Sequence, residues 1–253
     1  MRYLFILPEQ IGPECIELDR EQEHRLRRVL RLSHGDRLMI RIRGGRSVLW
    51  TRVVSFKKGR IRLVLDEDDG RGIESPAESV PARRGVNLAL SLLKGSSFER
   101  VFKASVELGV ETFTPLASIN CVVPRLSDRE RDRLIKIGDE ACQQCGRYEL
   151  PRLLDEARPE TYVQQQRALD NDVLMFHETV LDQPPACSGD RVQDDARRGV
   201  AVMIGPEGGW DPGEVAACER QGARVVRVPG HVLRAETAAL SFTALVVFRG
   251  VEL

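Results

Sequence analysis

The sequence predicts an α/β fold with a mainly parallel sheet, preceded by a smaller β-rich domain. Nearly continuous apolar runs at residues 87–93 and 200–204 are typical of strands buried on both faces of a parallel sheet. Segments with helical spacing alternate with such runs, which is the pattern of βαβ units. No apolar run approaches the roughly 20 residues that a membrane-spanning helix needs, so we expect a cytoplasmic protein with no membrane partner.

The N-terminal part of the chain predicts a small antiparallel barrel or sheet with one helix. Its apolar spacing indicates strands at residues 3–7, 37–43, 47–56 and 60–65 and a helix at residues 21–32. Residues 66–81 are rich in acids, Gly, Ser and Pro, the composition of a linker. We therefore place a first domain at residues 1–72, a linker at residues 73–82 and a second domain at residues 83–253.

The second domain alternates strands and helices. Further strands are expected at residues 112–116, 173–176 and 224–228, and helices at residues 211–221 and 236–248. Two more helix starts have the spacing of a capping box, one at Ser96 and Glu99 and the other at Ser127 and Glu130, and Gly109 stands where the first of these helices should end. Residues 181–199, with two prolines and many charges, predict a surface insertion.

Charge is unevenly distributed along the chain. The formal net charge is zero, which argues against a strongly basic nucleic-acid-binding protein as a whole. Between His24 and Arg62, however, basic residues recur and Asp36 is the only acid. Such a segment is either a solvated face or a surface for an anionic partner such as RNA backbone. The RNA-binding candidates within it are Arg25, Arg27, Arg28 and Arg31.

The cysteines do not predict a disulfide framework. Six of them are scattered through the chain, which indicates reduced thiols. Cys142 and Cys145 form a CxxC pair, which is half of a zinc site, but no second pair stands near them and the segment has the pattern of a helix. We therefore expect two thiols one helical turn apart and no metal.

Residues 200–211, with the sequence VAVMIGPEGGWD, predict a buried strand, a glycine-rich turn and a helix start. Gly205, Gly208 and Gly209 allow a ligand to approach the backbone closely. The carboxyl end of a strand is where crevices form in an open α/β sheet. The alternative is a tight connection that binds nothing. The patterns GxxxxGK[ST] and GxGxxG are missing, which weakens a kinase or dinucleotide-binding interpretation.

Charged side chains accompany this turn and the last helix. Glu207 is a candidate general base or ligand contact, or else a cap on neighbouring amides. Asp211 and Glu214 fit the N-cap and the capping-box acid of the helix after the turn. Glu236 suits the positive end of the last helix dipole, whereas Arg234 opposes that dipole. Arg234 is therefore the stronger functional candidate.

Another polar cluster is expected on the helix after Ser127. Glu140, Gln144 and Arg147 are spaced four and three residues apart and so share one helix face. Lys103 stands one turn before Glu107, with which a surface ion pair is the plain alternative to a functional role. Lys103, Gln144 and Arg147 are added to the RNA-binding candidates.

The chain resembles the ribosomal RNA small subunit methyltransferase E family, of the SPOUT class, nearly from end to end. Five segments carry the resemblance in the family's order: HRLRRVLRLSHGD (residues 24–36), FKASVELGVETFTPL (102–116), DEACQQCGR (139–147), IGPEGGW (204–210) and VLRAETAAL (232–240). One departure is the sequence VPGH at residues 228–231, where the family more often has a Leu-Gly-x-Arg style of sequence.

The resemblance implies a SPOUT-type α/β domain with a C-terminal trefoil knot, preceded by a PUA-like RNA-binding β-barrel. It further implies a homodimer that transfers a methyl group from S-adenosyl-L-methionine to N3 of one uridine in 16S ribosomal RNA, without a metal. The cofactor-binding residues that it implies are Met175, Phe176, His177, Ile204, Gly205, Pro206, Glu207, Gly208, Gly209, Val228, Leu233, Thr237 and Ala238.

Arg234 and Glu236 are the predicted catalytic residues, since the resemblance places them nearest the methyl group. The N3 proton of uridine must be removed or the uracil anion stabilised. Our hypothesis is that Arg234 stabilises that charge and that Glu236 orients Arg234 or accepts the proton. Two alternatives stay open: a related SPOUT methyltransferase acting on transfer RNA or on ribose, and a ribosome-assembly factor that binds RNA without catalysis.

Overall fold

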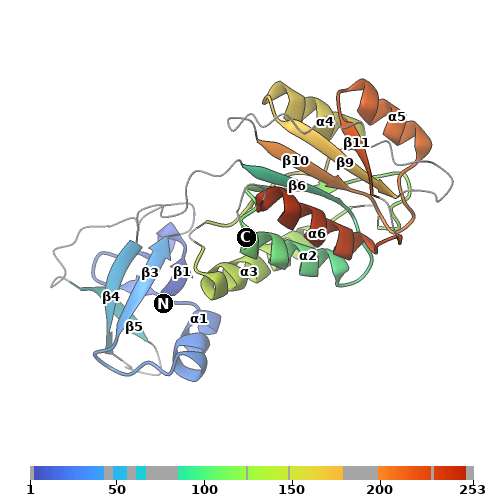
Figure 1. Ribbon diagram of the computed structural model, residues 1–253. Coiled ribbons are helices and arrows are strands. Elements are labelled where there is room, and N and C mark those ends of the chain that lie inside the picture. Colours follow the sequence, from blue (N-terminus) through green and yellow to red (C-terminus); the bar gives the residue numbers. More distant parts are fainter. Residues whose placement is uncertain are drawn as a thin grey trace. The chain divides into compact units, whose positions relative to one another are not determined.

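The computed structural model describes residues 3–42, 48–55, 61–66, 85–123, 125–147, 149–178, 199–228 and 231–248. Figure 1 shows its two compact units, the first formed by Met1–Ala82 with Cys142–Glu149 and the second by Arg83–Ala141 with Leu150–Leu253. The predicted linker at residues 73–82 and most of the predicted insertion at residues 181–199 lie outside the described residues.

The first unit is built on a sheet with the strand order β1-β3-β4-β5-β2. Its strands are β1 (Tyr3–Ile6), β2 (Ile16–Glu17), β3 (Arg37–Ile42), β4 (Val48–Ser55) and β5 (Arg62–Leu65). The prediction of an antiparallel arrangement is wrong for β1, which pairs in parallel with β3. A helical segment connects the two strands, and such a crossover is what a parallel pair requires. No ladder among the described residues closes this sheet into a barrel.

The predicted N-terminal helix forms in two parts. Asp19 accepts a hydrogen bond from the backbone of Gln22 and caps α1 (Arg20–His24), which continues as a π-helical turn, Arg25–Val29. Leu26 anchors this turn in the core of the unit. The chain leaves the turn at Arg31, which has a φ of 51°. This left-handed conformation costs a residue other than glycine about 1 kcal/mol.

The second unit contains a six-stranded sheet whose ladders are all parallel. The order is β11 (Arg224–Val228), β9 (Asp172–Glu178), β10 (Val200–Ile204), β6 (Val86–Ser91), β7 (Thr112–Leu116) and β8 (Arg152–Leu153). Every residue of β6, β7 and β10 is buried, as the continuous apolar runs indicated. The predicted α/β class with a mainly parallel sheet is confirmed. The two-residue strand β8 is too short to show a periodicity and was not predicted.

Helices cover both faces of this sheet (Figure 1). They are α2 (Ser97–Glu107), α3 (Asp128–Cys145), α4 (Pro159–Ala168), α5 (Pro212–Arg220) and α6 (Ala235–Val247). On one face α2 packs against α6, and α6 lies on β6 and β10; on the other face α4 packs against α5. The sequence did not predict α4. It did predict that Arg147 lies on the α3 face, but Gly146, with a φ of 83°, ends the helix before that residue.

The predicted helix caps form with one exception. Ser127 and Glu130 make the reciprocal bonds of a capping box before α3, and Asp211 with Glu214 does so before α5. Ser96 stands at the N-cap of α2, but its side chain makes no capping bond. The Glu99 carboxylate is instead 3.0 Å from Nη2 of Arg133 on α3. The Glu99 carboxylate therefore pairs with Arg133 and does not form the capping box with Ser96.

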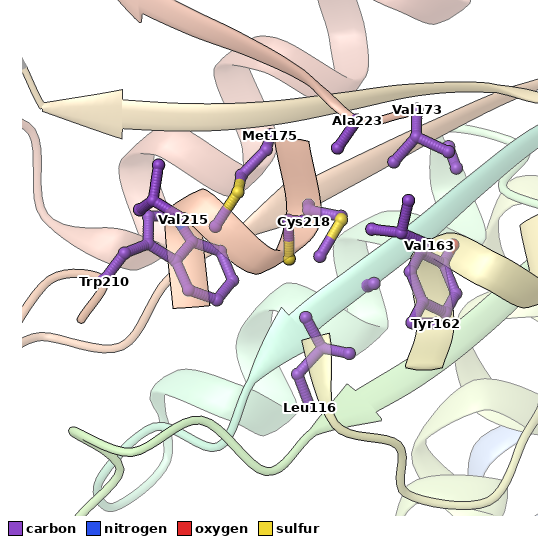
Figure 2. Packing of buried hydrophobic residues seen from close by; sticks show 12 residues of the cluster. Leu116, Tyr162, Val163, Val173, Met175, Trp210, Val215, Cys218 and Ala223 are labelled. Carbon is purple, nitrogen blue, oxygen red and sulfur yellow. The ribbon is translucent and has the colours of Figure 1, made fainter. Parts of the chain in front are cut away.

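The core between the sheet and the pair α4 and α5 fixes the orientation of the strands' side chains. Figure 2 shows Met175 of β9 among Trp210, Val215 and Cys218, and Tyr162 of α4 is fully buried in the same cluster. Burial raises the pKa of the Tyr162 hydroxyl above its ordinary value and that of the Cys218 thiol to about 12. Met175 is fully buried here, so its side chain points into this core.

Candidate active site

A pocket of about 770 Å³ lies at the carboxyl ends of β9 and β10 in the second unit. Phe176, His177 and Glu178 at the end of β9 form one side of it. The turn that follows β10 forms the second side, and the start of α6 forms the third. These are the three segments that the sequence indicated, and they meet where crevices open in a parallel α/β sheet.

Most of the predicted cofactor-binding and catalytic residues line this pocket. Those that do are Phe176, His177, Ile204, Gly205, Pro206, Glu207, Gly209, Leu233, Arg234, Glu236 and Ala238. Met175 does not, because neighbouring side chains of a strand point to opposite faces and its own lies in the core. Gly208 faces Asn120, and Thr237 is exposed beside the lining residues Glu236 and Ala238. Val228 ends β11, and its side chain lies outside the part of the chain that the structure describes.

Other lining residues were not predicted: Lys94, Ser97, Glu178, Trp210, His231, Val232, Ala235 and Phe242. Lys94 and Ser97 follow β6, which pairs with β10, so the strand order brings them to the same edge. Phe242 lies two turns into α6, at helical spacing from Ala235 and Ala238. The helical spacing of Phe242 can be read from the sequence, and so this lining residue could have been predicted. The pairing of β6 with β10 cannot be read from the sequence.

The glycine-rich turn is packed tightly against Trp210. A Cβ on Gly205 would lie 3.0 to 3.1 Å from atoms of the indole ring, and Nε1 of that ring donates a hydrogen bond of 2.8 Å to the carbonyl of Phe176. Gly209 has a φ of 72°, and a Cβ there would lie 2.9 Å from Oε1 of Glu178. Both glycines are therefore required where the turn faces the pocket.

A neighbouring loop, residues 118–120, holds this turn from outside the pocket. Nδ2 of Asn120 donates a hydrogen bond of 3.1 Å to the carbonyl of Gly209. Glu214, which is only 6% exposed, accepts hydrogen bonds from the Ser118 hydroxyl, the Ile119 amide and the Asp211 amide. The capping-box acid of α5 thus joins the loop after β7 to the turn after β10.

Glu207 caps a backbone amide. Its Oε1 accepts a hydrogen bond of 2.9 Å from the Lys94 amide, just after β6. Of the roles that the sequence left open for this residue, the structure supports the cap. The contact also ties the turn after β10 to the start of the segment that leads into α2.

Arg234 and Glu236 stand at the start of α6 with different surroundings. Arg234 is the N-cap residue and is exposed, and its side chain makes no capping bond. The Glu236 carboxylate lies 3.4 Å from the Ser97 hydroxyl and 3.6 Å from Nη2 of Arg100. In the part of the chain that the structure describes, no hydrogen bond or ion pair joins Glu236 to Arg234. The hypothesis that Glu236 orients Arg234 therefore has no support.

The pocket combines an apolar wall with carboxylates. The rings of Phe176 and Phe242 stack at a centroid distance of 4.0 Å and an angle of 7°. Glu178, Glu207 and Glu236 supply negative charge around this wall. Lys94 and Arg234 also line the pocket, so the lining suits a ligand with a flat apolar part and charges of both signs.

The arginines predicted to bind RNA divide into distinct environments in the first unit. Arg27, Arg28 and Arg31 are exposed, and Arg25 is partly buried. Other cations of the same segment are neutralised, since Arg37 and Arg52 form ion pairs with Asp66 at 2.6 and 3.0 Å. Arg41 is buried over the ring of Tyr3. The exposed cationic surface therefore contains fewer arginines than the sequence suggested.

The remaining candidates lie at the end of α3 and on α2. Lys103 and Gln144 are exposed. The carbonyl of Arg147 accepts hydrogen bonds from the Tyr3 hydroxyl at 2.9 Å and from Arg41 at 2.8 Å. Cys142 is buried, which raises the pKa of its thiol to about 12, whereas Cys145 is exposed.

Metal ligands and membrane spans are both missing from the residues that the structure describes. These residues contain no group of three or more His, Cys, Asp or Glu side chains that could hold a metal ion. None of the helices among them is long and apolar enough to cross a membrane.

The chain is similar to known methyltransferases along most of its length. Residues 81–247 match the family model of the RNA methyltransferase domain. The ribosomal RNA small subunit methyltransferase E of a Synechocystis species is 30% identical over 237 residues, which cover 93% of this chain and 73% of that protein. The chain belongs to the ribosomal RNA small subunit methyltransferase E family.

One further relative and two solved structures are similar to nearly the whole chain. The protein of that name from Bacillus subtilis is 26% identical over 94% of this chain and 93% of its own length. A putative methyltransferase from Legionella pneumophila, solved with bound SAM, has a TM-score of 0.71 and 25% identity over 97% of both chains. The Neisseria gonorrhoeae member of the family, bound to S-adenosylmethionine, shares the fold with a TM-score of 0.75 and 23% identity over 96% of this chain and 95% of its own.

Proposed function

We propose that this protein transfers a methyl group from S-adenosylmethionine to N3 of a uridine in the 16S ribosomal RNA of the small subunit. The observation that carries the proposal is the convergence of the end of β9, the turn after β10 and the start of α6 on one pocket. Membership of the ribosomal RNA small subunit methyltransferase E family supports the same activity.

The pocket fits S-adenosylmethionine in size and chemistry. Its volume of about 770 Å³ is within the range of pockets for small molecules and cofactors. The stacked Phe176 and Phe242 offer an apolar wall to an adenine ring, and Gly205 and Gly209 bring backbone within reach of a ligand. When bound there, the cofactor supplies an electrophilic methyl group. Glu178 and the other lining carboxylates are suited to the positive charge of its sulfonium.

The residues at the start of α6 act on the uridine. The carboxylate of Glu236 accepts the proton of N3, which is within its chemical capacity as a general base. Arg234, at the α6 N-cap and lining the pocket, donates hydrogen bonds to the uracil carbonyl oxygens and so stabilises the negative charge left by that proton. The walls of the pocket align the uracil ring with the methyl group, which is the main demand of a displacement at carbon.

The first unit binds the RNA backbone in this proposal. Arg27, Arg28 and Arg31 present exposed cations that supply affinity independent of sequence. The pocket in the second unit selects the uridine. A PUA-like barrel in the first unit, a trefoil knot in the second and a homodimer are parts of the same proposal, and they rest on the family resemblance.

The test is methyl transfer to purified 30S subunits that lack their native methylation. Radiolabelled S-adenosylmethionine is added with the protein, and the 16S RNA is digested to nucleosides. We expect the label in 3-methyluridine. Label in a ribose or in transfer RNA would replace the proposal with the related SPOUT activity, and failure to bind the cofactor in calorimetry would favour an assembly factor without catalysis.

A further inference from the structure

The segment between β6 and the exposed face of α2 carries basic side chains beside the pocket. Lys94 and Ser97 line the pocket. Nη2 of Arg100 donates a hydrogen bond of 2.9 Å to the Ser97 hydroxyl. Lys103 follows three residues later, and residues three apart are neighbours on a helix surface. Lys94, Arg100 and Lys103 are called the α2 strip below.

The charge of the α2 strip is largely unneutralised. The ammonium groups of Lys94 and Lys103 form no ion pair with any part of the chain that the structure describes, although Glu107 stands one turn from Lys103. Arg100 is 3.6 Å from the Glu236 carboxylate, but its side chain is 65% exposed. A guanidinium has five N–H donors, so these two contacts leave donors for another partner. The strip therefore presents available cations.

The α2 strip begins at Lys94, which lines the pocket together with three carboxylates. The carboxylates of Glu178, Glu207 and Glu236 face the pocket, which suits a cationic cofactor. The strip runs away from the pocket along α2, where an anionic group would meet lysine and arginine. A base that enters a pocket leaves its flanking phosphates at the rim, and phosphate contacts are what position a nucleic acid.

We propose that Lys94, Arg100 and Lys103 bind the RNA phosphates that flank the nucleotide in the pocket, and so position that nucleotide for methylation. The inference rests on the proposed function, because it requires an RNA substrate. It assigns to the second unit a phosphate contact of its own, additional to the arginines of the first unit. Arg100 has a further effect, since its ion pair with Glu236 couples phosphate binding to the catalytic carboxylate.

The first experiment measures RNA affinity against salt concentration. A fluorescently labelled single-stranded RNA that contains uridine is titrated with the wild type and with the triple variant Lys94→Gln, Arg100→Gln, Lys103→Gln. For single strands, each phosphate that a protein neutralises contributes about 0.7 to the slope of log affinity against log salt. We therefore expect the slope of the triple variant to be smaller by about 2.

A matched control removes the same charge elsewhere. Arg152, Arg220 and Arg224 are exposed and stand at the start of β8, the end of α5 and the start of β11. These positions lie at the amino ends of the strands, opposite the pocket. The triple variant with glutamine at these positions should keep the wild-type slope. Equal slopes in the two triple variants would overturn the proposal, since the effect would then follow from net charge alone.

Two further readouts separate the inference from its premise. The melting temperature should be unchanged in the α2-strip variant, because none of its side chains is buried. Cofactor affinity should be unchanged in Lys103→Gln alone, because Lys103 does not line the pocket. Arg100→Lys should keep most of the slope that Arg100→Gln removes, as a phosphate contact requires charge. A wild type that binds cofactor but no RNA would refute the proposed function and this inference together, whereas a wild-type slope in the strip variant of an RNA-binding enzyme would refute only the inference.

Discussion

The carboxylate of Glu214 accepts a hydrogen bond of 2.9 Å from the hydroxyl of Ser118, a residue 96 positions earlier in the chain. The same carboxylate accepts from the amide of Ile119 at 2.8 Å. Asn120, next in the loop, donates to the carbonyl of Gly209. The position of the glycine-rich turn therefore depends on a buried side chain that does not line the pocket.

Replacement of Glu214 by Gln should weaken cofactor binding. One carboxylate oxygen becomes an NH2 group that faces a donor, which costs about 1–3 kcal/mol of stability, and displacement of the turn should raise the cofactor Kd by about tenfold. Calorimetric titration and thermal melts measure the two effects. Glu130→Ala is the control, because it removes the acceptor of the capping box before α3 and should lower stability alone. If both variants leave the Kd unchanged, Glu214 has only a structural role.

Replacement of Gly209 by Ala should lower cofactor affinity in addition to stability. The new Cβ costs about 1 kcal/mol because of the left-handed backbone and lies 2.9 Å from Oε1 of Glu178. Gly109→Ala has the same backbone cost at a φ of 83°, with nothing within 4 Å of its Cβ. Both variants should melt at lower temperature, and only Gly209→Ala should lose cofactor affinity. Equal cofactor affinity in the two would contradict the role of this turn.

Replacement of Arg31 by Gly should raise stability and lower RNA affinity together. The wild-type φ of 51° is a strain that glycine relieves, by about 1 kcal/mol. Arg28→Gly removes a charge from the π-helical turn that precedes Arg31 without relieving such strain, and should lower stability by about 1 kcal/mol. Thermal melts should therefore shift in opposite directions while RNA affinity falls in both. Undiminished RNA affinity in Arg31→Gly would remove this residue from the RNA-binding surface.

Replacement of Arg234 by Ala should lower kcat by roughly tenfold to a thousandfold with little change in cofactor affinity. The side chain is exposed and makes no capping bond, so folding should not suffer. Single-turnover methyl transfer and cofactor calorimetry provide the two measurements. A parallel loss of both would make Arg234 a binding residue instead of a catalytic one.

Asp66 should make the stability of the first unit sensitive to acid. Its hydrogen bond and ion pair with Arg52, together with Arg37, hold the pKa of the carboxyl below its ordinary value of 3.8. A group whose pKa is depressed in the folded state stabilises the fold at pH values above its unfolded pKa. That contribution is lost as the pH falls through the folded pKa. In thermal melts from pH 7 down to about pH 3, the melting temperature of the wild type should fall in acid. This decrease should be missing in Asp66→Asn. Asp155→Asn, at an exposed ion pair, should behave as the wild type.

The sequence by itself determined most of the strands and helices of the second unit and the segments that form the site. Strands at residues 112–116, 200–204 and 224–228 form with the predicted bounds. For residues 200–204 the reason is that a strand buried on both faces needs a continuous apolar run. The glycines of the turn after β10 and the polar start of α6 were also readable, since positive φ and helix caps are local requirements. Five motifs in order identified the family.

Only the tertiary structure decided which of these segments meet. Ser97 and Glu236 are 139 residues apart, and their contact depends on the packing of α2 against α6. The ion pairs of Arg37 and Arg52 with Asp66, the burial of Arg41 and the parallel pairing of β1 likewise depend on partners distant in the sequence. Periodicity reports how each segment is buried, but strand order and side-chain partners follow from long-range packing, which no local pattern encodes.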